Sequence, residues 1–481
     1  MHEIEASGKM KEKHLKVVMY PWLAMGHIIP YFELAKKFAE KGHEVTLMLP
    51  NKAKLKILQS SNNVNNHPDA FSSLLTLHTI TIPHVHPLPL GTQLNSEIPF
   101  HLETHLVTAF DLLRPQFHSI LATFQPNLVF YDFAHWVPQA VSASGICAKC
   151  VTYFPVSAVA LSLHMIPFRN PPTGRAVVDE DTCVAPIPPG YPSSDIVFNN
   201  PKTLIDLLYK PYGKDLTFYQ RITTAIRSSD AIAIKTCKEI EGKYCDYLSS
   251  QYNNKPVFVS GPVQPDHKEA ELKPYWAEWL GKFGVGSVVY CAFGSQAELE
   301  LDQFQEFLLG LEMTKLPFLI AFKPPKGYAS VEDAFPEGFK DRVGERGVVT
   351  GEWVQQPQIL SHPSVGCFVS HCGSGSIWES LLSKNQIVLI PYLPDQKLFS
   401  EVITKELKVG VKVETGENGT WISKQSLCKA IKSVMDEESE IGRLVKMEHQ
   451  IWRRKLGEPG FMDAYVHNFI QDLQALLHSI R

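Results

Sequence analysis

The chain repeats one local pattern, in which a short apolar segment, a turn and an amphipathic segment with helical spacing lead to another short apolar segment. In the first copy, the apolar segments are 15–20 and 43–49, and the helical spacing runs from Tyr31 to Phe38. A strand, a crossover helix and a second strand at this spacing predict a parallel βαβ unit. We expect further strands of the same sheet at 75–81, 127–132 and 149–154.

The same pattern restarts in the second half of the chain. The predicted strands are continuous apolar segments, as expected for strands that helices cover on both faces. We therefore predict an α/β fold with two doubly wound parallel sheets. The second sheet has predicted strands at 286–293, 318–322, 347–350, 365–369 and 387–391, with helices at 301–313, 374–383 and 396–406.

The length of the chain also indicates more than one domain. At 481 residues it exceeds the size at which a single hydrophobic core keeps growing. We place the first domain at 1–260, a linker rich in Pro, Gly and charge at 261–275, and the second domain at 276–462. The segment 463–481 carries an apolar stripe at helical spacing, and we expect this helix to pack back on the first domain.

Composition excludes several classes of function. The net charge of −4 and the lack of a Lys/Arg stripe give no sign of a basic surface that would bind nucleic acid. The longest apolar stretch, near 151–166, is too short to span a bilayer, and the charged first 14 residues do not form a secretory signal. Nine scattered cysteines suit reduced thiols. We therefore expect a cytoplasmic monomer without membrane insertion, and no metal site, because the 19 His form no cluster of ligand spacing.

One segment, 353–396, gathers the residue types that a nucleotide-sugar requires. Trp353 follows a predicted strand beside polar glutamines, so its indole is available to stack on a flat heterocycle. His371 precedes a Gly-rich turn, and we expect Ser374 to cap the helix that follows. Free N–H groups at such a helix start favour an anion such as a diphosphate.

Carboxylates and amides complete this segment. Glu379, in the early turns of the same helix, is suited to accept hydrogen bonds from ribose hydroxyls. Asp395 and Gln396 follow the strand predicted at 387–391, where they are suited to bind sugar hydroxyls. In doubly wound folds, ligands bind at the carboxyl ends of the strands, so these side chains are expected to line one cleft.

A catalytic pair is predicted in the first domain. His27 lies in the turn after the first strand, and Asp132 ends another strand of the same sheet. A histidine with a pKa near neutrality can remove the proton of an acceptor hydroxyl. A carboxylate on the other ring nitrogen would fix the tautomer and stabilise the imidazolium, as in a Ser-His-Asp triad.

The 44 residues from Trp353 to Gln396 resemble the donor signature of plant family-1 UDP-dependent glycosyltransferases, W-x-x-Q, H-C-G-x-x-S-x-x-E and D-Q, with every fixed spacer kept. The loop after the first predicted strand reads G-H-x-x-P. It is similar to the loop in which this family carries its catalytic base, a histidine. The resemblance implies a GT-B fold, with two Rossmann-like domains facing a cleft. It also implies inverting transfer from a UDP-sugar without metal or other cofactor, with His27 as base and Asp132 as its partner.

The resemblance further implies a role for each donor residue. Trp353 would stack on uracil, Gln356 and Glu379 would bind ribose, His371 and Ser376 phosphate, and Asp395 and Gln396 the sugar. The family usually has Trp and Asn where this chain has Ser374 and Gly375. The implied donor set is Ser295, Trp353, Val354, Gln356, His371, Gly373, Ser374, Gly375, Ser376, Glu379, Asp395 and Gln396.

Other segments, among them 19–22, 130–136 and 237–242, resemble the branch that extends a sugar already attached to a flavonoid or anthocyanin. Enzymes of that branch add glucose, xylose or rhamnose to a 3-O-glucoside. UDP-glucose is our first choice of donor, and UDP-rhamnose and UDP-xylose stay open. Candidate walls of the acceptor pocket, all near strand ends, are Trp22, His135, Trp136 and Phe154, and each could equally be a core residue.

Several alternatives stay open at this stage. The acceptor could be a flavonoid or terpenoid aglycone rather than a glycoside. A non-catalytic UDP-sugar sensor on the same fold is disfavoured because both His27 and Asp132 are present. A GT-B epimerase or phosphorylase would need further acidic residues or a pyridoxal-binding lysine, which no motif indicates. A dehydrogenase is disfavoured because neither first turn carries G-x-G-x-x-G.

Overall fold

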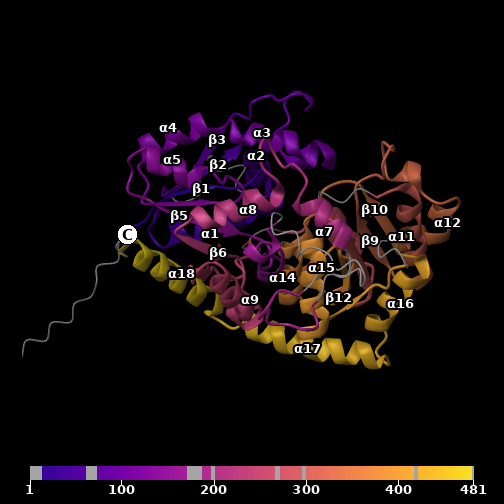
Figure 1. Cartoon of the computed structure of the whole chain (residues 1–481). Coiled ribbons are helices and arrows are strands. Elements are labelled where there is room, and N and C mark those ends of the chain that lie inside the picture. Colours follow the sequence, from indigo (N-terminus) through magenta and orange to yellow (C-terminus); the bar gives the residue numbers. More distant parts are fainter. Residues whose placement is uncertain are drawn as a thin grey trace, which may run out of the picture.

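The computed structural model describes residues 14–60, 73–170, 187–196, 201–265, 271–294, 299–416 and 421–478. Two parallel sheets organise this part of the chain, and Figure 1 shows them as separate layered units, one indigo to magenta and one mainly orange. The α/β fold with two doubly wound parallel sheets is therefore confirmed.

The first sheet has seven parallel strands in the order β3-β2-β1-β4-β5-β6-β7. The reversal of strand order at β1 and β4 is a topological switch point, where such folds bind their ligands. The strands are β1 (Lys16–Tyr20), β2 (Glu44–Pro50), β3 (Leu75–Ile80), β4 (Leu128–Tyr131), β5 (Lys149–Phe154), β6 (Ala231–Ile234) and β7 (Val257–Val259). The helices are α1 (Met25–Glu40), α2 (Asn51–Ser60), α3 (Glu103–Asp111), α4 (Arg114–Phe124), α5 (Val137–Ala143), α6 (Ala158–His164), α7 (Pro201–Leu208), α8 (Phe218–Ser228) and α9 (Lys238–Gln251).

The second sheet has six parallel strands in the order β10-β9-β8-β11-β12-β13. Its switch point lies between β8 and β11. The strands are β8 (Val288–Ala292), β9 (Phe318–Ala321), β10 (Gly347–Thr350), β11 (Val365–Ser370), β12 (Gln386–Leu389) and β13 (Gly410–Lys412). The helices are α10 (Pro274–Gly281), α11 (Leu301–Thr314), α12 (Phe339–Val343), α13 (Gln356–Ser361), α14 (Ser374–Leu382), α15 (Pro394–Glu401), α16 (Lys424–Met435), α17 (Glu440–Leu456) and α18 (Phe461–His478).

The structure adds three short strands that the sequence pattern did not predict. β6, β7 and β13 have only three or four residues each. β7 was obscured because the Pro- and Gly-rich segment that follows it made the region resemble a linker. The helix predicted at 396–406 is also wrong in detail, since α15 ends at Glu401 and a π-helical turn covers Val402–Glu406.

The last helix returns to the first sheet. In Figure 1, α17 runs along the lower edge of the second unit, and α18 continues beneath the first. Phe469 of α18 packs against Phe38 and Phe130, with ring centroids 6.2 Å and 6.1 Å apart. Its apolar stripe belongs to the same buried cluster as β1, β2 and β4, so the end of the chain completes the core of the first sheet.

The two units also share a hydrophobic core. Ile234 and Cys237, at the end of β6, belong to one buried cluster with Ile377 and Trp378 of α14. Polar contacts reinforce this interface, where the hydroxyl of Tyr244 donates to Glu406 Oε1 at 2.6 Å and Lys243 pairs with the same carboxylate at 2.7 Å. Buried contacts of this kind hold the carboxyl edges of the two sheets toward each other.

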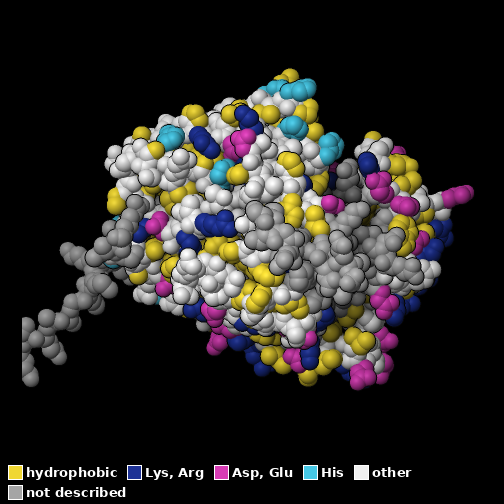
Figure 2. All heavy atoms as spheres, in the orientation of Figure 1, with side chains coloured by type: hydrophobic (Ala, Val, Ile, Leu, Met, Phe, Trp, Pro, Cys, Tyr) yellow, Lys and Arg dark blue, Asp and Glu magenta, His cyan; other side chains and the backbone are white. Residues whose placement is uncertain are grey.

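The surface carries charges of both signs. Among the side chains coloured in Figure 2, Lys and Arg alternate with Asp and Glu without a large patch of one sign. Of the helices in the described ranges, none combines the length and the apolar content needed to cross a membrane.

Truncating Phe469 tests the return of α18. Phe469→Ala leaves a cavity between α18 and the first sheet, so we expect the free energy of unfolding to fall by about 3–5 kcal/mol. Asn468→Ala, at the exposed neighbouring position, should change it by less than about 0.5 kcal/mol. Denaturant unfolding of both variants measures the difference. Equal, small effects would contradict the packing described here.

Candidate active site

A histidine and an aspartate meet at the switch point of the first sheet. β1 and β4 pair in parallel with Tyr20 opposite Tyr131, so the loops that follow both strands leave the same edge. His27, in the first turn of α1, therefore lies next to Asp132, and the distance from His27 Nδ1 to Asp132 Oδ2 is 2.7 Å. The two residues that the sequence placed 105 positions apart are in direct contact.

The backbone holds the aspartate in place. Asp132 is fully buried, and its Oδ1 accepts the N–H groups of Trp22 at 2.8 Å and Phe133 at 2.6 Å. Because an ionised carboxylate only accepts, Nδ1 of His27 carries the proton and Nε2 keeps its lone pair. This arrangement suits His27 Nε2 to remove a proton from a substrate hydroxyl.

The start of α14 is the predicted anion-binding part of the site. Gly373 is the N-cap and Ser374 the first helical residue, so the expectation that Ser374 caps this helix was wrong. Among the residues that the structure describes, the Ser374 hydroxyl is instead buried without a hydrogen-bond partner, and so is Nδ1 of His371. An unpartnered hydroxyl beside the free N–H groups of a nine-residue helix fits a phosphate group.

His371 is a neutral group in this environment. Burial lowers the pKa of His371 to about 4, so the ring carries no charge at neutral pH. Gly294 and Gly373 lie against it, and a Cβ atom at Gly373 would come within 2.5 Å of its Nε2. The glycines therefore allow the ring and the helix start to occupy the same small space.

Gln356 links Glu379, its partner in the predicted ribose site, to Ser376 and Tyr290. Its Nε2 donates to Glu379 Oε2 at 2.6 Å and to Ser376 Oγ at 3.2 Å, and its Oε1 accepts the Tyr290 hydroxyl at 3.2 Å. Burial raises the pKa of Glu379, and the hydrogen bond from Gln356 opposes part of that rise. The network holds the carboxylate in a fixed position before any ligand binds.

Trp353 is available for stacking, as its position after β10 predicted. Its side chain is 68% exposed, a high value for a tryptophan, whereas Val354 beside it is buried in the core of the second sheet. An exposed indole that a buried neighbour anchors offers a flat apolar surface to an aromatic ligand.

Asp395 brings the two halves of the site together. It lies in the first turn of α15, where Oε1 of Gln396 accepts the N–H groups of Tyr392 and Leu393 at 3.0 Å each. Burial raises the pKa of Asp395, and interaction with His27 of the other unit opposes part of that rise. The catalytic pair of the first sheet thus lies within electrostatic reach of the sugar-binding pair predicted in the second.

Comparisons with known proteins identify the family. Residues 336–453 match the family described as UDP-glucoronosyl and UDP-glucosyl transferase. UDP-glucosyl transferase 79T1 of Saponaria officinalis is 49% identical over 97% of this chain and 100% of that protein. Anthocyanidin 3-O-glucoside 2'''-O-xylosyltransferase of Arabidopsis thaliana is 47% identical over 98% of this chain and 99% of that protein. The chain belongs to the plant family-1 UDP-glycosyltransferases.

Solved structures agree with the glycosyltransferase fold. Glycyrrhiza uralensis UGT73P12 superposes with a TM-score of 0.77 at 22% identity, covering 96% of each chain. Arabidopsis thaliana UGT89C1, solved with UDP-L-rhamnose, superposes with a TM-score of 0.73 at 19% identity, covering 97% of this chain and 99% of that one. The GT-B fold that the donor signature implied is therefore confirmed.

The predicted acceptor walls of the glycosyltransferase are mostly core residues. Trp22, Trp136 and Phe154 are only 1%, 2% and 1% exposed, so packing is the role that the structure gives them. Trp22 stacks on Phe133, and Trp136 donates its N–H to Asp111. Aromatic type and position at a strand end had suggested a wall, but the same features describe a core.

His135 differs from these three residues because it is only half-buried. Burial lowers its pKa to about 4, and the charge of Arg221 adds to that effect. Contact between His135 and an acceptor stays a prediction. Ser295, the predicted phosphate contact in the loop after β8, lies outside the described residues.

Two further side chains next to His27 escaped the sequence analysis. Phe133, half-buried, places its ring 5.1 Å from the imidazole. Glu103, at the start of α3, accepts from Asn95 Nδ2 at 3.5 Å. Burial raises the pKa of Glu103, and Asn95, Lys210 and His27 oppose part of that rise. Glu103 carried no local motif, so only the fold reveals that it lies near the base.

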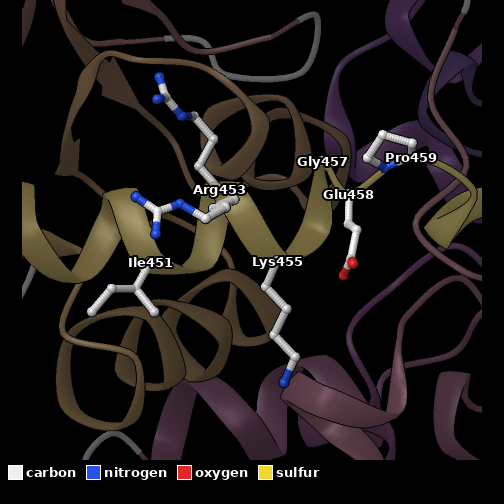
Figure 3. A pocket seen from close by; sticks show the side chains of 7 residues that line it. Ile451, Arg453, Lys455, Gly457, Glu458 and Pro459 are labelled. Carbon is white, nitrogen blue, oxygen red and sulfur yellow. The ribbon is translucent and has the colours of Figure 1, made fainter.

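A separate surface pocket lies at the C-terminal end of α17. Figure 3 shows Arg453 and Lys455 projecting from the last turn of this helix, with Glu458 just beyond its end. The residues of the candidate active site lie elsewhere, at the carboxyl edges of the two sheets. The pocket is lined by Ile451, Arg453, Arg454, Lys455, Gly457, Glu458 and Pro459.

Removing the Trp353 indole tests the donor side of the glycosyltransferase. Stacking of a base on an aromatic ring is typically worth about 1–3 kcal/mol, so Trp353→Ala should weaken UDP binding by about 5- to 100-fold. Trp421→Ala removes another partly exposed indole and should leave UDP affinity unchanged. Calorimetric titration with UDP measures both variants. Unchanged affinity in Trp353→Ala would refute the stacking role.

Proposed function

We propose that the glycosyltransferase moves a sugar from a UDP-sugar to a hydroxyl of a sugar that a flavonoid or anthocyanin already carries. The observation that carries the proposal is the His27–Asp132 contact within electrostatic reach of Asp395. A general base bound to its orienting carboxylate thus faces the pair expected to hold the donor sugar. This is the geometry that direct transfer to a bound hydroxyl requires.

In the proposed reaction, His27 Nε2 takes the proton of the acceptor hydroxyl as its oxygen attacks the anomeric carbon. The bond from that carbon to the diphosphate oxygen breaks, and UDP leaves with the bonding electrons. Attack from the opposite face turns an α-linked donor into a β-glycoside. Asp132 stabilises the imidazolium that forms.

The leaving diphosphate gains negative charge as this bond breaks. The N–H groups at the start of α14 and the unpartnered Ser374 hydroxyl are positioned to bind it. His371 is neutral because burial lowers its pKa, so it adds no positive charge beside the diphosphate. These groups stabilise the departing UDP more strongly than the intact donor, which favours transfer.

Polar groups beside the base support an acceptor that carries a sugar. Glu103 accepts from Asn95, and the charges of Lys210 and His27 both act on the pKa of Glu103. A carboxylate, an amide and an ammonium are suited to sugar hydroxyls and poorly suited to a flat apolar aglycone. The Arabidopsis relative is itself named for transfer to an anthocyanidin 3-O-glucoside.

UDP-glucose is our first choice of donor, with UDP-xylose and UDP-rhamnose as alternatives. One relative is named a glucosyl transferase and another a xylosyltransferase, so the names support both sugars. A Cβ atom at Gly375 would meet nothing within 4 Å, which leaves open space where the family usually has an Asn side chain. A donor sugar bound to this chain therefore lacks the contact with the side-chain amide of that Asn.

A mass-spectrometric screen tests this function. Purified protein is incubated with UDP-glucose, UDP-xylose or UDP-rhamnose and with quercetin, cyanidin or their 3-O-glucosides. We expect a second sugar on the 3-O-glucosides and no product from the aglycones.

Glu103→Gln should raise the KM for the glucoside by about 10-fold, since a hydrogen bond to a charged group is lost. Glu40→Gln, at an exposed position, is the control.

Transfer to the aglycones but not to the glucosides would refute the proposed acceptor and leave the family assignment intact. No change of acceptor KM in Glu103→Gln would remove that residue from the acceptor site. Binding of UDP without transfer to any acceptor would instead favour a sensor.

A further inference from the structure

A lysine is buried between the two units of the glycosyltransferase. Lys235 directly follows β6 at the carboxyl edge of the first sheet, and only 2% of it is exposed. Its backbone N–H donates to the carbonyl of Phe154 at 3.0 Å, which continues the pairing of β5 with β6. Ile234, directly before it, and Cys237, two positions after it, pack in one cluster with Ile377 and Trp378 of α14. Lys235 is thus held where β6 meets the donor-binding helix.

The ammonium of Lys235 has no bonded partner in the described parts of the chain. It faces two carboxylates, Glu379 of the donor site and Glu33 of α1, but neither pairs with it at ion-pair distance. Each carboxylate has another partner, since Glu379 accepts from Gln356 at 2.6 Å and Glu33 pairs with Lys36 at 2.7 Å. Burial lowers the pKa of Lys235 to about 8, and the two carboxylates oppose part of that fall.

A buried ammonium is costly in a folded protein unless something binds it. A lysine kept only for packing would be better replaced by an apolar side chain of the same length. A lysine kept for an ion pair would contact one of the two carboxylates that face it. Neither explanation fits Lys235, whereas an oxygen-rich anionic ligand arriving beside Glu379 would supply the missing acceptors.

We propose that Lys235 is a donor-binding residue that the first unit contributes to the UDP-sugar site, where its ammonium donates hydrogen bonds to oxygens of the ribose-diphosphate segment. The inference rests on the proposed function, because it places the ribose of the donor at Glu379. In this arrangement, the second unit provides Trp353, which stacks on uracil, and the N-terminus of α14, which binds the diphosphate. Lys235 of the first unit lies on the opposite side of the bound donor.

Lys235→Met tests this inference, because it removes the charge and keeps the length of the side chain. We expect a 10- to 100-fold loss of UDP affinity (about one charged hydrogen bond) and a matching rise in the KM for the UDP-sugar. The KM for the acceptor should stay unchanged. The Tm of the ligand-free variant should equal or exceed that of the natural protein, since a buried unpaired charge is gone. Lys235→Arg, which keeps the charge, should recover part of the affinity.

Lys36→Met is the matched control, because it removes a nearby lysine that already pairs with Glu33. It should leave the UDP affinity within about twofold of the natural protein. Uridine has the ribose of UDP but no diphosphate. Titration with uridine therefore distinguishes a contact with ribose oxygens from a contact with diphosphate oxygens. A loss confined to UDP assigns Lys235 to the diphosphate, and an equal loss with uridine assigns it to the ribose.

UDP binding as tight in Lys235→Met as in the natural protein would overturn the inference. So would a fall in Tm together with unchanged donor KM, which would mean that Lys235 only supports the fold. In either case the natural protein would still bind UDP and transfer sugar, so the proposed function would stand. Failure of the natural protein to bind UDP would overturn both.

Discussion

The hydrogen bond between His27 and Asp132 is the interaction on which the rest of the site depends. It exists because β1 and β4 are neighbours at the switch point of the first sheet, so two loops far apart in sequence begin at the same edge. The backbone N–H groups of Trp22 and Phe133 hold the carboxylate, and the carboxylate fixes the imidazole. A rigid sheet therefore supplies a base whose reactive nitrogen has one defined state.

The second sheet supplies the complementary half through the same topological device. Its strand ends lead into α14 and α15, whose first turns carry unpartnered polar atoms and the Asp395–Gln396 pair. The hydrophobic cluster shared by β6 and α14 brings these strand ends toward His27. Burial, rather than charge alone, sets the pKa values of the side chains at these strand ends. It keeps His371 neutral and lowers the pKa of Lys235.

Much of this arrangement follows from the sequence, and the failures share a physical cause. Strands β1 to β5 and β8 to β12 were predictable because continuous apolar segments alternate there with helical patterns, and this includes the four-residue strands β4, β9, β10 and β12. The exposed Trp353 was predictable from its polar neighbours. For Trp22, Trp136 and Phe154 the sequence left wall and core both open, because a core aromatic and a pocket aromatic look alike in one dimension, and their burial favours the core. Glu103 and Lys235 were missed because only tertiary contacts bring them to the site.

The central claim is that His27 acts as the base for a donor bound mainly by the other unit. The most direct test is a comparison of transfer rate and UDP affinity in His27→Ala and the natural protein. The account predicts that kcat falls by at least about 10²- to 10⁴-fold, the typical contribution of a general base. The dissociation constant for UDP should change by less than about twofold, since the main donor contacts remain. A variant that retains transfer activity, or that loses UDP binding as severely as it loses activity, would contradict the account.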